Sequence, residues 1–521
     1  MLFTLALLVV TASMAVAQTF TNPVIWEDLA DVEVIRVEDA FYMTASTMHY
    51  SPGAPVLKSY DLAHWQYIGH SVPSLDFGIG NFSLEDNTRA YVNGIWASSL
   101  QYRESTQLYY WIGCIHGVDT TYVYTAPAAE GPWTRHSEID KCYYDVGLLF
   151  DDKDDVYLAY GNTNISVAQL NSDLTRELSS QHVFTTPEEI ETLEGSRFYE
   201  INGTYYLFLT RPPDSQFIVR SSGGPFGPYD QIRPVADNVT APIEGAGAPH
   251  QGGLLQTQNG DWLYMAFIDA YPGGRSPVLA PITWSHDGWP VLETAPDGSW
   301  AREYPLPLPV HPLEPYNPDN FTSLDPVWEW NHNPDPTGYS TGDDGLILRT
   351  VSVTDDLYQA RNTLVHRIPG PDANATIELD IANMVNGDRA GLAMLRDESA
   401  YIAVLKDADT GANRILMYDG LSISREDNWA TNSTGSQIDS VELEGDRVWL
   451  RAYADIRTAD CDTCGIARFY YSFDGTTFEQ LGSTKKLSTD WPFFMGYRFA
   501  VFNYATVELG GEVAVKSFTL G

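Results

Sequence analysis

Five copies of one sequence pattern place residues capable of acid–base chemistry at the same position. Each copy is a short strand, a polar turn and a second strand that opens with an aromatic residue. The residue 11 or 12 positions before that aromatic is acidic or a histidine in four copies, and in the second copy a tryptophan stands 13 positions before it: Asp31, Trp96, Asp145, Glu194 and His250. Three carboxylates held close together are costly, because they repel each other and lose hydration. Such a cluster is therefore expected only where a function or a bound ion requires it. The register therefore predicts a functional site.

Hydrolysis of a glycosidic bond requires at least two carboxyl groups, one on each side of the bond. One must be protonated to donate to the leaving oxygen, and the other must be ionised to activate water or to attack. A third carboxylate nearby raises the pKa of the acid by like-charge repulsion. The chain also holds 31 Tyr, 21 Phe and 14 Trp, and aromatic faces suit a neutral sugar. A sugar-binding site without catalysis is the alternative from another functional class.

The spacing of the copies predicts the elements that must position these side chains. The copies start 65, 49, 49 and 56 residues apart, which matches one four-stranded blade per copy. Five copies predict a five-bladed β-propeller over residues 18–304. If the first strand of each copy is innermost, the five side chains share one end of the central channel.

A second domain is expected after a proline-rich joint. Residues 305–320 contain PLPLPVHPLEPYNP, which cannot pair as a central strand and is interpreted as an interdomain linker. Residues 321–521 alternate apolar and polar positions in several runs, which favours a β-sandwich. We find no long amphipathic helix, so the expected fold class is all-β.

Composition and charge exclude several classes of function. The chain has 521 residues, enough for two domains, and a formal net charge of −39. Such a charge repels phosphate backbones and anionic lipid surfaces, so nucleic acid and membranes are not expected partners. An apolar content of 44% excludes a disordered chain.

The first 17 residues and the cysteines indicate an extracellular protein. Residues 1–17 are apolar and end in Ala-Val-Ala, which predicts a secretory signal rather than a membrane anchor. Four cysteines then favour two disulfides, and we expect Cys114–Cys142 and Cys461–Cys464 because each pair lies within one domain. A redox or zinc motif is the alternative for the second pair. Seven Asn-x-Ser/Thr tripeptides are consistent with a glycoprotein.

The motifs around the carboxylates resemble glycoside hydrolase family 43. NPVIWEDLADVEVIRV, YDVGLLFDDKDDVYLAYG and EGSRFYE are similar to the segments that carry the family's general base, pKa modulator and general acid. The resemblance implies these roles for Asp31, Asp145 and Glu194, a five-bladed propeller, and inversion by a single displacement. The sequence departs from the family pattern where Val32, Val146, Ser98 and Ser196-Arg197 replace Pro or Pro-His.

The resemblance extends over the mature chain and implies further contacts. GGRSPVLAPITWSHDGWPVL is similar to the family segment whose arginine contacts the sugar, which corresponds to Arg275. Trp96 is expected to stack on the sugar, with a structural tryptophan as the alternative. His250 is expected to line the channel floor or to help hold a structural calcium ion, with a buried, hydrogen-bonded histidine as the alternative; no cofactor is required and no metal-ligand cluster is evident. His49 and Tyr50 are expected at the pocket rim, with an inert loop as the alternative.

The expected activity is removal of arabinose side chains from arabinoxylan. The chain looks most like fungal α-L-arabinofuranosidases that act on doubly substituted xylose, and exo-β-1,4-xylosidase activity on xylo-oligosaccharides is the alternative. FTSLDPVWEWNHNPDP and LYQARNTLVHRI resemble the sandwich appended to β-xylosidase-like members. We expect that domain to support the propeller, with an independent carbohydrate-binding module as the alternative, and we expect a monomer.

Overall fold

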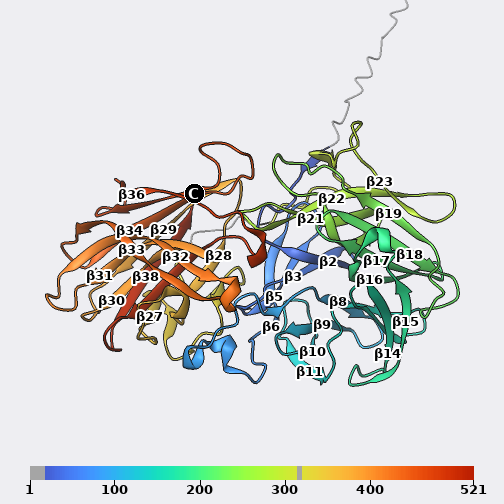
Figure 1. Ribbon diagram of the computed structural model, residues 1–521, viewed down its shortest axis with the longest axis horizontal. Helices are drawn as coiled ribbons and strands as arrows, with labels where there is room; N and C mark the ends of the chain where they lie inside the picture. Colours follow the sequence, from blue (N-terminus) through green and yellow to red (C-terminus); the bar gives the residue numbers. More distant parts are fainter. Residues whose placement is uncertain (1–17, 314–318) are drawn as a thin grey trace, which may run out of the picture.

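The computed structural model describes residues 18–313 and 319–521, which form two β-rich lobes side by side (Figure 1). One lobe is a five-bladed β-propeller and the other is a β-sandwich, so the predicted fold class is confirmed. Residues 1–17, the predicted signal, lie outside the described residues.

Each propeller blade is an antiparallel sheet of four or five strands. The strands, blade by blade, are β2 (Ala30–Val37), β3 (Ala40–Ser46), β5 (Gly53–Ser59) and β6 (Gln66–Val72); β7 (Gly94–Ile95), β8 (Ser99–Arg103), β9 (Leu108–His116), β10 (Thr120–Ala126) and β11 (Thr134–Ile139); β12 (Gly147–Phe150), β13 (Val156–Tyr160), β14 (Asn164–Leu170) and β15 (Glu177–Thr185); β16 (Glu194–Ile201), β17 (Thr204–Arg211), β18 (Ser215–Ser221) and β19 (Ile232–Asp237); and β20 (His250–Gln256), β21 (Trp262–Asp269), β22 (Arg275–Trp284) and β23 (Pro290–Leu292).

The five innermost strands are those that the repeat predicted. Each packs against the innermost strands of the two neighbouring blades, and β20 of the last blade closes the ring against β2 of the first. The second strand of each blade lies between sheets on both faces, so it is continuously apolar, as in β21 with the sequence WLYMAFID. A short sheet of β1 (Thr19–Thr21) and β24 (Glu303–Pro305) joins the two ends of the propeller segment.

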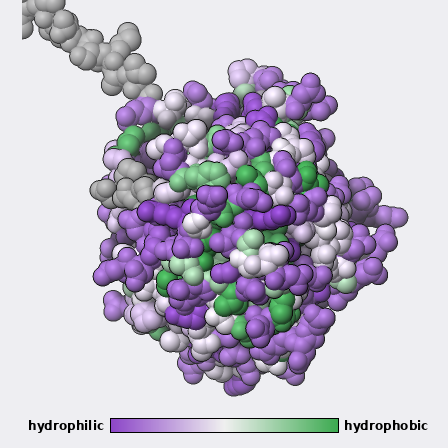
Figure 2. All heavy atoms as spheres, turned by 90° about the vertical axis from the view of Figure 1, so that its left-hand side faces the viewer, coloured by the Kyte–Doolittle hydropathy of each residue, from purple (hydrophilic) through white to green (hydrophobic). Residues whose placement is uncertain are grey.

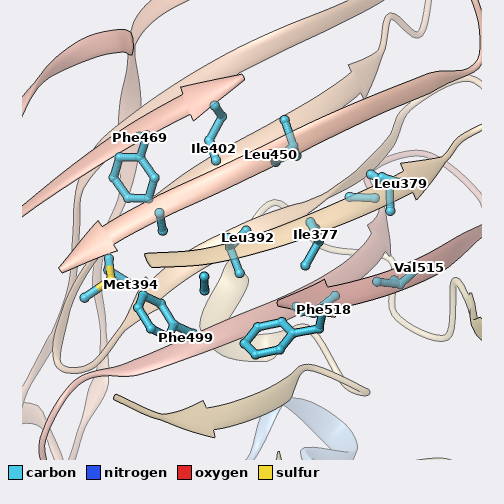
Figure 3. Close-up of a cluster of buried hydrophobic side chains, with 14 of the residues drawn as sticks. Ile377, Leu379, Leu392, Met394, Ile402, Leu450, Phe469, Phe499, Val515 and Phe518 are labelled. Atoms are coloured by element: carbon cyan, nitrogen blue, oxygen red, sulfur yellow. The ribbon is translucent and has the colours of Figure 1, made fainter. Parts of the chain in front are cut away.

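The sandwich consists of two large antiparallel sheets. One contains β4 (Tyr50–Ser51), β25 (Glu329–Asn331), β28 (Leu364–Arg367), β37 (Arg498–Ala505), β30 (Asp388–Leu395), β31 (Glu398–Lys406), β32 (Asn413–Ser424) and β33 (Ala430–Glu442), and the other contains β26 (Tyr339–Gly342), β27 (Gly345–Arg349), β38 (Glu512–Leu520), β29 (Asp372–Asp380), β34 (Arg447–Asp455), β35 (Ile466–Ser472) and β36 (Glu479–Lys486). Their apolar faces meet in one core, where Ile377, Leu392 and Phe499 lie between the sheets (Figure 3). Figure 2 looks onto this lobe from its far side and shows a mostly hydrophilic face.

The two domains share strands and a buried interface. The propeller segment contributes β4, which pairs with β25 as the edge strand of the sandwich sheet. The segment predicted as a linker begins against the propeller: Leu308 is buried in the propeller core, and the His311 N–H donates to Asp61 Oδ2 at 2.8 Å. Residues 314–318 of that segment lie outside the described residues.

Helical structure in the described ranges is limited to six short 3₁₀ turns: η1 (Gly80–Ser83), η2 (Glu85–Asn87), η3 (Glu188–Ile190), η4 (Leu357–Gln359), η5 (Arg425–Asp427) and η6 (Trp491–Phe493). Among the described residues, no helix has the length and apolarity needed to cross a membrane. Both predicted disulfides, Cys114–Cys142 and Cys461–Cys464, are confirmed.

Candidate active site

The backbone at the start of several inner strands is bulged and left-handed. Asp31, Asp145, Gly195 and Gln251 have φ values of 56°, 51°, 65° and 44°. Pairing registers shift at the bulges in β2, β16 and β20. Non-glycine residues in this conformation are strained, and such strain concentrates at functional sites. The bulges turn the first side chains of these strands away from the regular pleat, toward one end of the channel.

Asp31 lies at the bulge in β2 and is 6% exposed. Arg275 Nη1 donates to its Oδ1 at 3.0 Å, and the Ser46 hydroxyl donates to its Oδ2 at 2.6 Å. Both donors fix the orientation of the carboxylate, and the guanidinium supplies a charge complementary to its ionised form. This environment fits a group that accepts a proton.

Glu194 is the first residue of β16 and is partly exposed. Its Oε2 accepts hydrogen bonds from Asn162 Nδ2 and from the Tyr144 hydroxyl, the latter at 3.4 Å. Burial raises the pKa of Glu194, the two hydrogen bonds oppose this effect, and the negative charge of Asp31 adds to it, so the pKa remains above its ordinary value. A carboxylic acid with a raised pKa fits the role of proton donor.

Asp145 is close enough to both Glu194 and Asp31 for their charges to affect its pKa. Burial, and then the charges of Glu194 and Asp31, raise its pKa well above the ordinary value. Its Oδ2 accepts the Gly195 N–H at 3.1 Å, directly after Glu194. Asp145 therefore orients the peptide that carries Glu194, and the negative charge of Glu194 is one cause of the raised pKa of Asp145. The structure thus brings together the three carboxylates that the sequence singled out.

Arg275 connects the site to the sandwich domain, which the sequence did not predict. Besides its ion pair with Asp31, its Nε donates to the Phe494 carbonyl oxygen at 3.0 Å and its backbone N–H donates to Asp28 Oδ1 at 2.8 Å. Arg498 of the sandwich binds the other oxygen of Asp28 at 2.8 Å. Arg275 is 8% exposed, so it is a buried ion-pair residue whose position depends on the sandwich.

A row of aromatic rings crosses from the propeller to the sandwich beside the acids. Trp96 stacks on His116 with ring centroids 3.9 Å apart, Phe494 lies 5.5 Å from Trp96, and Trp491 lies 5.6 Å from Phe494. Trp96 also lies 6.4 Å from Tyr144, the residue that donates to Glu194. The Trp96 Nε1–H is bound to the Val92 carbonyl oxygen, so its ring is fixed in place.

His250 is the first residue of β20 and is held by contacts with neighbouring protein groups. Its Nδ1 is 2.9 Å from the Ala248 carbonyl oxygen and its ring packs edge-on against Phe267. Among the described residues, no group of three or more His, Cys, Asp or Glu side chains is placed to hold a metal ion.

His49 and Tyr50 lie in the domain interface and not at the pocket rim, which corrects the expectation from the sequence. They are 0% and 1% exposed. The His49 ring packs against Tyr50, Tyr91, His332 and Phe493, and β4, which begins at Tyr50, pairs with the sandwich. The short loop after β3 packs against the second domain, so both side chains are part of the domain interface.

Comparison with known proteins gives consistent results for both domains. A family model described as glycosyl hydrolases family 43 matches residues 20–290, and one described as a beta xylosidase C-terminal concanavalin A-like domain matches residues 318–520. A solved family 43 structure is 45% identical with a TM-score of 0.92, and the match covers 97% of this chain and 100% of that one.

Two characterised relatives are similar at lower identity. A β-xylosidase from Formosa agariphila is 27% identical over 96% of this chain and 90% of its own length. A non-reducing end α-L-arabinofuranosidase from Bacteroides ovatus is 27% identical over 76% of this chain and 77% of its own. With the acidic cluster, the two-domain fold and these matches in place, the chain belongs to glycoside hydrolase family 43.

Proposed function

We propose that this family 43 glycosidase acts on arabinoxylan and releases α-L-arabinofuranosyl side chains with inversion. Asp31 is the general base, Glu194 the general acid and Asp145 the residue that orients Glu194 and tunes its pKa. The observation that carries the proposal is the aromatic row, which begins beside the acids and continues onto the sandwich with Trp491 56% exposed.

The proposed reaction is a single displacement at the anomeric carbon. A water molecule attacks that carbon while Asp31 takes one of its protons, and the bond to the leaving oxygen breaks as Glu194 donates its proton to that oxygen. The raised pKa of Glu194 keeps a proton available, and the paired donors Arg275 and Ser46 hold Asp31 in place. The developing positive charge on the sugar is balanced by the carboxylates around it.

An enzyme that removes a side chain must bind the polymer beside its pocket, and the aromatic row supplies such a surface. The flat rings of Phe494 and Trp491 offer apolar faces for sugar rings, outside the cluster of acids. An enzyme that removes single xylose units from chain ends needs no such extension. This argument favours side-chain removal over exo-xylosidase activity.

The relatives are consistent with both activities. The solved structure at 45% identity is described as an engineered enzyme with endo-xylanase and exo-arabinofuranosidase activity, and the two curated relatives are a β-xylosidase and an arabinofuranosidase. All act on pentose glycosides, which supports an arabinoxylan-derived substrate for this chain.

The test is NMR analysis of products released from arabinoxylan and from linear xylo-oligosaccharides at the earliest times. The expected result is free arabinose from arabinoxylan only, first seen as the β anomer, with loss of branch signals from doubly substituted xylose. Release of xylose from the linear oligosaccharides would instead establish the exo-β-xylosidase alternative. A Glu194→Gln variant that released sugar at the unchanged rate would refute the assignment of the acid.

We also propose that the protein is secreted and acts as a monomer. Two disulfides in a chain of this size support an oxidising compartment. Sequencing of the N-terminus of protein recovered from the culture medium, with cleavage expected before Gln18, tests secretion. Light scattering in solution tests the monomer, since a mass of twice that of the chain would contradict it.

A further inference from the structure

Arg197 is a fully buried arginine that follows Glu194 by three residues on the same inner strand, β16. Its Nη2 donates to the main-chain carbonyl oxygen of Asp31 at 2.7 Å, and its Nη1 donates to the Ser196 carbonyl oxygen at 3.2 Å. The hydrogen bonds of the guanidinium all go to main-chain oxygens, and its Nε has no hydrogen-bond partner among the described residues. The charge is thus held mainly by backbone oxygens.

A buried positive charge that is held mainly by backbone oxygens lowers the stability of the folded protein. A guanidinium without a directly paired carboxylate loses its hydration without full compensation, so stability alone gives no reason for it. Two glycines allow the neighbouring inner strands to approach this part of β16 closely. A Cβ at Gly147 of β12 would lie 2.6 Å from the Ser196 carbonyl oxygen and 3.0 Å from Arg197 Cα, and one at Gly253 of β20 would lie 2.7 Å from the Tyr199 hydroxyl.

The groups that face Arg197 come from several inner strands. Asp31 and Glu33 approach from β2, Asp145 from the loop just before β12, and Tyr199 from β16 itself. Arg197 lowers the pKa of Glu33 and of Asp145, although burial keeps both raised. The guanidinium therefore lies between the catalytic end of the channel and Glu33.

The opposite end of the channel is a separate cavity. A cavity of about 300 Å³ is lined by residues of all five inner strands, including Glu33, Gln101 and Tyr199. Since the inner strands run in the same direction, residues two to six positions after the carboxylates lie roughly 7–20 Å further along the axis. Glu33 accepts the Leu100 N–H at 2.8 Å and Gln101 Nε2 at 3.1 Å, so its charge is partly satisfied without Arg197.

We propose that Arg197 is a positioning residue for hydrolysis, which fixes the left-handed peptide of Asp31 and supplies a permanent positive charge beneath the three carboxylates. The hydrogen bond to the Asp31 carbonyl holds the strained backbone that aims the base, and the charge reduces the repulsion among acids that must hold different protonation states. This inference rests on the proposed roles of Asp31 and Glu194.

The test compares Arg197→Met, Arg197→Lys and the double variant Arg197→Met/Glu33→Gln with the unaltered protein. For Arg197→Met we expect kcat on arabinoxylan to fall about 10- to 100-fold with KM within about twofold, since a displaced base affects the chemical step. Loss of the positive charge stabilises the protonated carboxyls, so the pH profile of kcat/KM should move upward by about one unit. Arg197→Lys keeps the charge but loses the forked geometry, so kcat should fall while the profile stays in place.

The double variant separates a positioning role from simple charge balance. Removing the Glu33 charge together with that of Arg197 relieves the buried imbalance, so this protein should fold even if Arg197→Met does not. We expect the double variant to remain slow with a shifted profile. Recovery of the rate and the profile in the double variant, or a normal rate in folded Arg197→Met, would overturn the proposal. Asp31→Asn is measured in parallel to distinguish failure of this proposal from failure of the proposed function. Full activity in Asp31→Asn would refute the role of Asp31 itself.

Discussion

Substitution of Asn162 tests whether Glu194 is the general acid. Asn162 Nδ2 donates to Glu194 Oε2, and this hydrogen bond favours the ionised form and lowers the pKa of Glu194. In Asn162→Ala that donor is lost, so the pKa of Glu194 rises. An acid acts in its protonated form, so the alkaline limb of the kcat/KM profile should move to higher pH.

The magnitude follows from the strength and the exposure of this bond. Hydrogen bonds to charged groups contribute about 1.5–3 kcal/mol. Glu194 is partly exposed and Asn162 is exposed, so water replaces part of the lost donor and about 1–1.5 kcal/mol remains. At ~1.4 kcal/mol per unit, the alkaline limb should move by about one pH unit. Removal of the longer hydrogen bond in Tyr144→Phe should move the limb in the same direction by about half as much.

The assay is the initial rate of arabinose release from arabinoxylan across the pH range in which the protein stays folded. Gln169→Ala, an amide removed from β14 of the adjacent blade, is the matched control and should leave both limbs in place. A 4-nitrophenyl arabinofuranoside is the second control, because its leaving group needs little protonation and its rate should depend weakly on the alkaline limb. An unchanged limb, or one displaced to lower pH, in Asn162→Ala would refute the assignment of Glu194.

Three further changes test other parts of the site. Glu194→Gln should lower kcat on arabinoxylan about 10²- to 10⁴-fold and lower the rate on the 4-nitrophenyl glycoside much less. Equal losses on both substrates would contradict the role of Glu194 as the general acid. Trp491→Ala should raise KM for arabinoxylan about tenfold without changing the rate on the aryl glycoside. The control Val507→Ala, at another exposed position, should change neither value. An unaltered KM in Trp491→Ala would exclude Trp491 from polymer binding. Arg498→Met should leave the buried Asp28 without its charged partner and lower the free energy of unfolding by about 3–5 kcal/mol. An unchanged midpoint of denaturant unfolding would show that this ion pair does not stabilise the contact between the domains.

The sequence predicted the propeller because its signal is local and repeated. Each copy contains a strand, a turn and an apolar second strand, and those features depend only on neighbouring residues. The register that singled out Asp31, Asp145 and Glu194 is a property of the same repeat, so the three carboxylates were found with it. Both disulfides were also predicted, because each pair lies within a single domain.

Residues whose role depends on the second domain left no such local signal. His49 and Tyr50 follow a strand of the first blade, and nothing in their sequence shows that the sandwich covers them. Asn162 and Phe494 likewise lie outside any repeated register. Tyr144 is the exception, because its position directly before Asp145 could have drawn attention to it.

The contacts around Asp31 and Asp28 connect the candidate active site to the sandwich. Arg275 pairs with Asp31 across 244 residues of sequence, and Asp28 pairs with Arg498 across 470. The Phe494 carbonyl fixes the remaining guanidinium face of Arg275. A displacement of the sandwich would remove the Phe494 carbonyl from Arg275 and Arg498 from Asp28, so the guanidinium that pairs with Asp31 would lose part of its support. With Asp31 as the proposed base, we predict that deletion of residues 321–521 abolishes hydrolysis of small aryl glycosides as well as of the polymer.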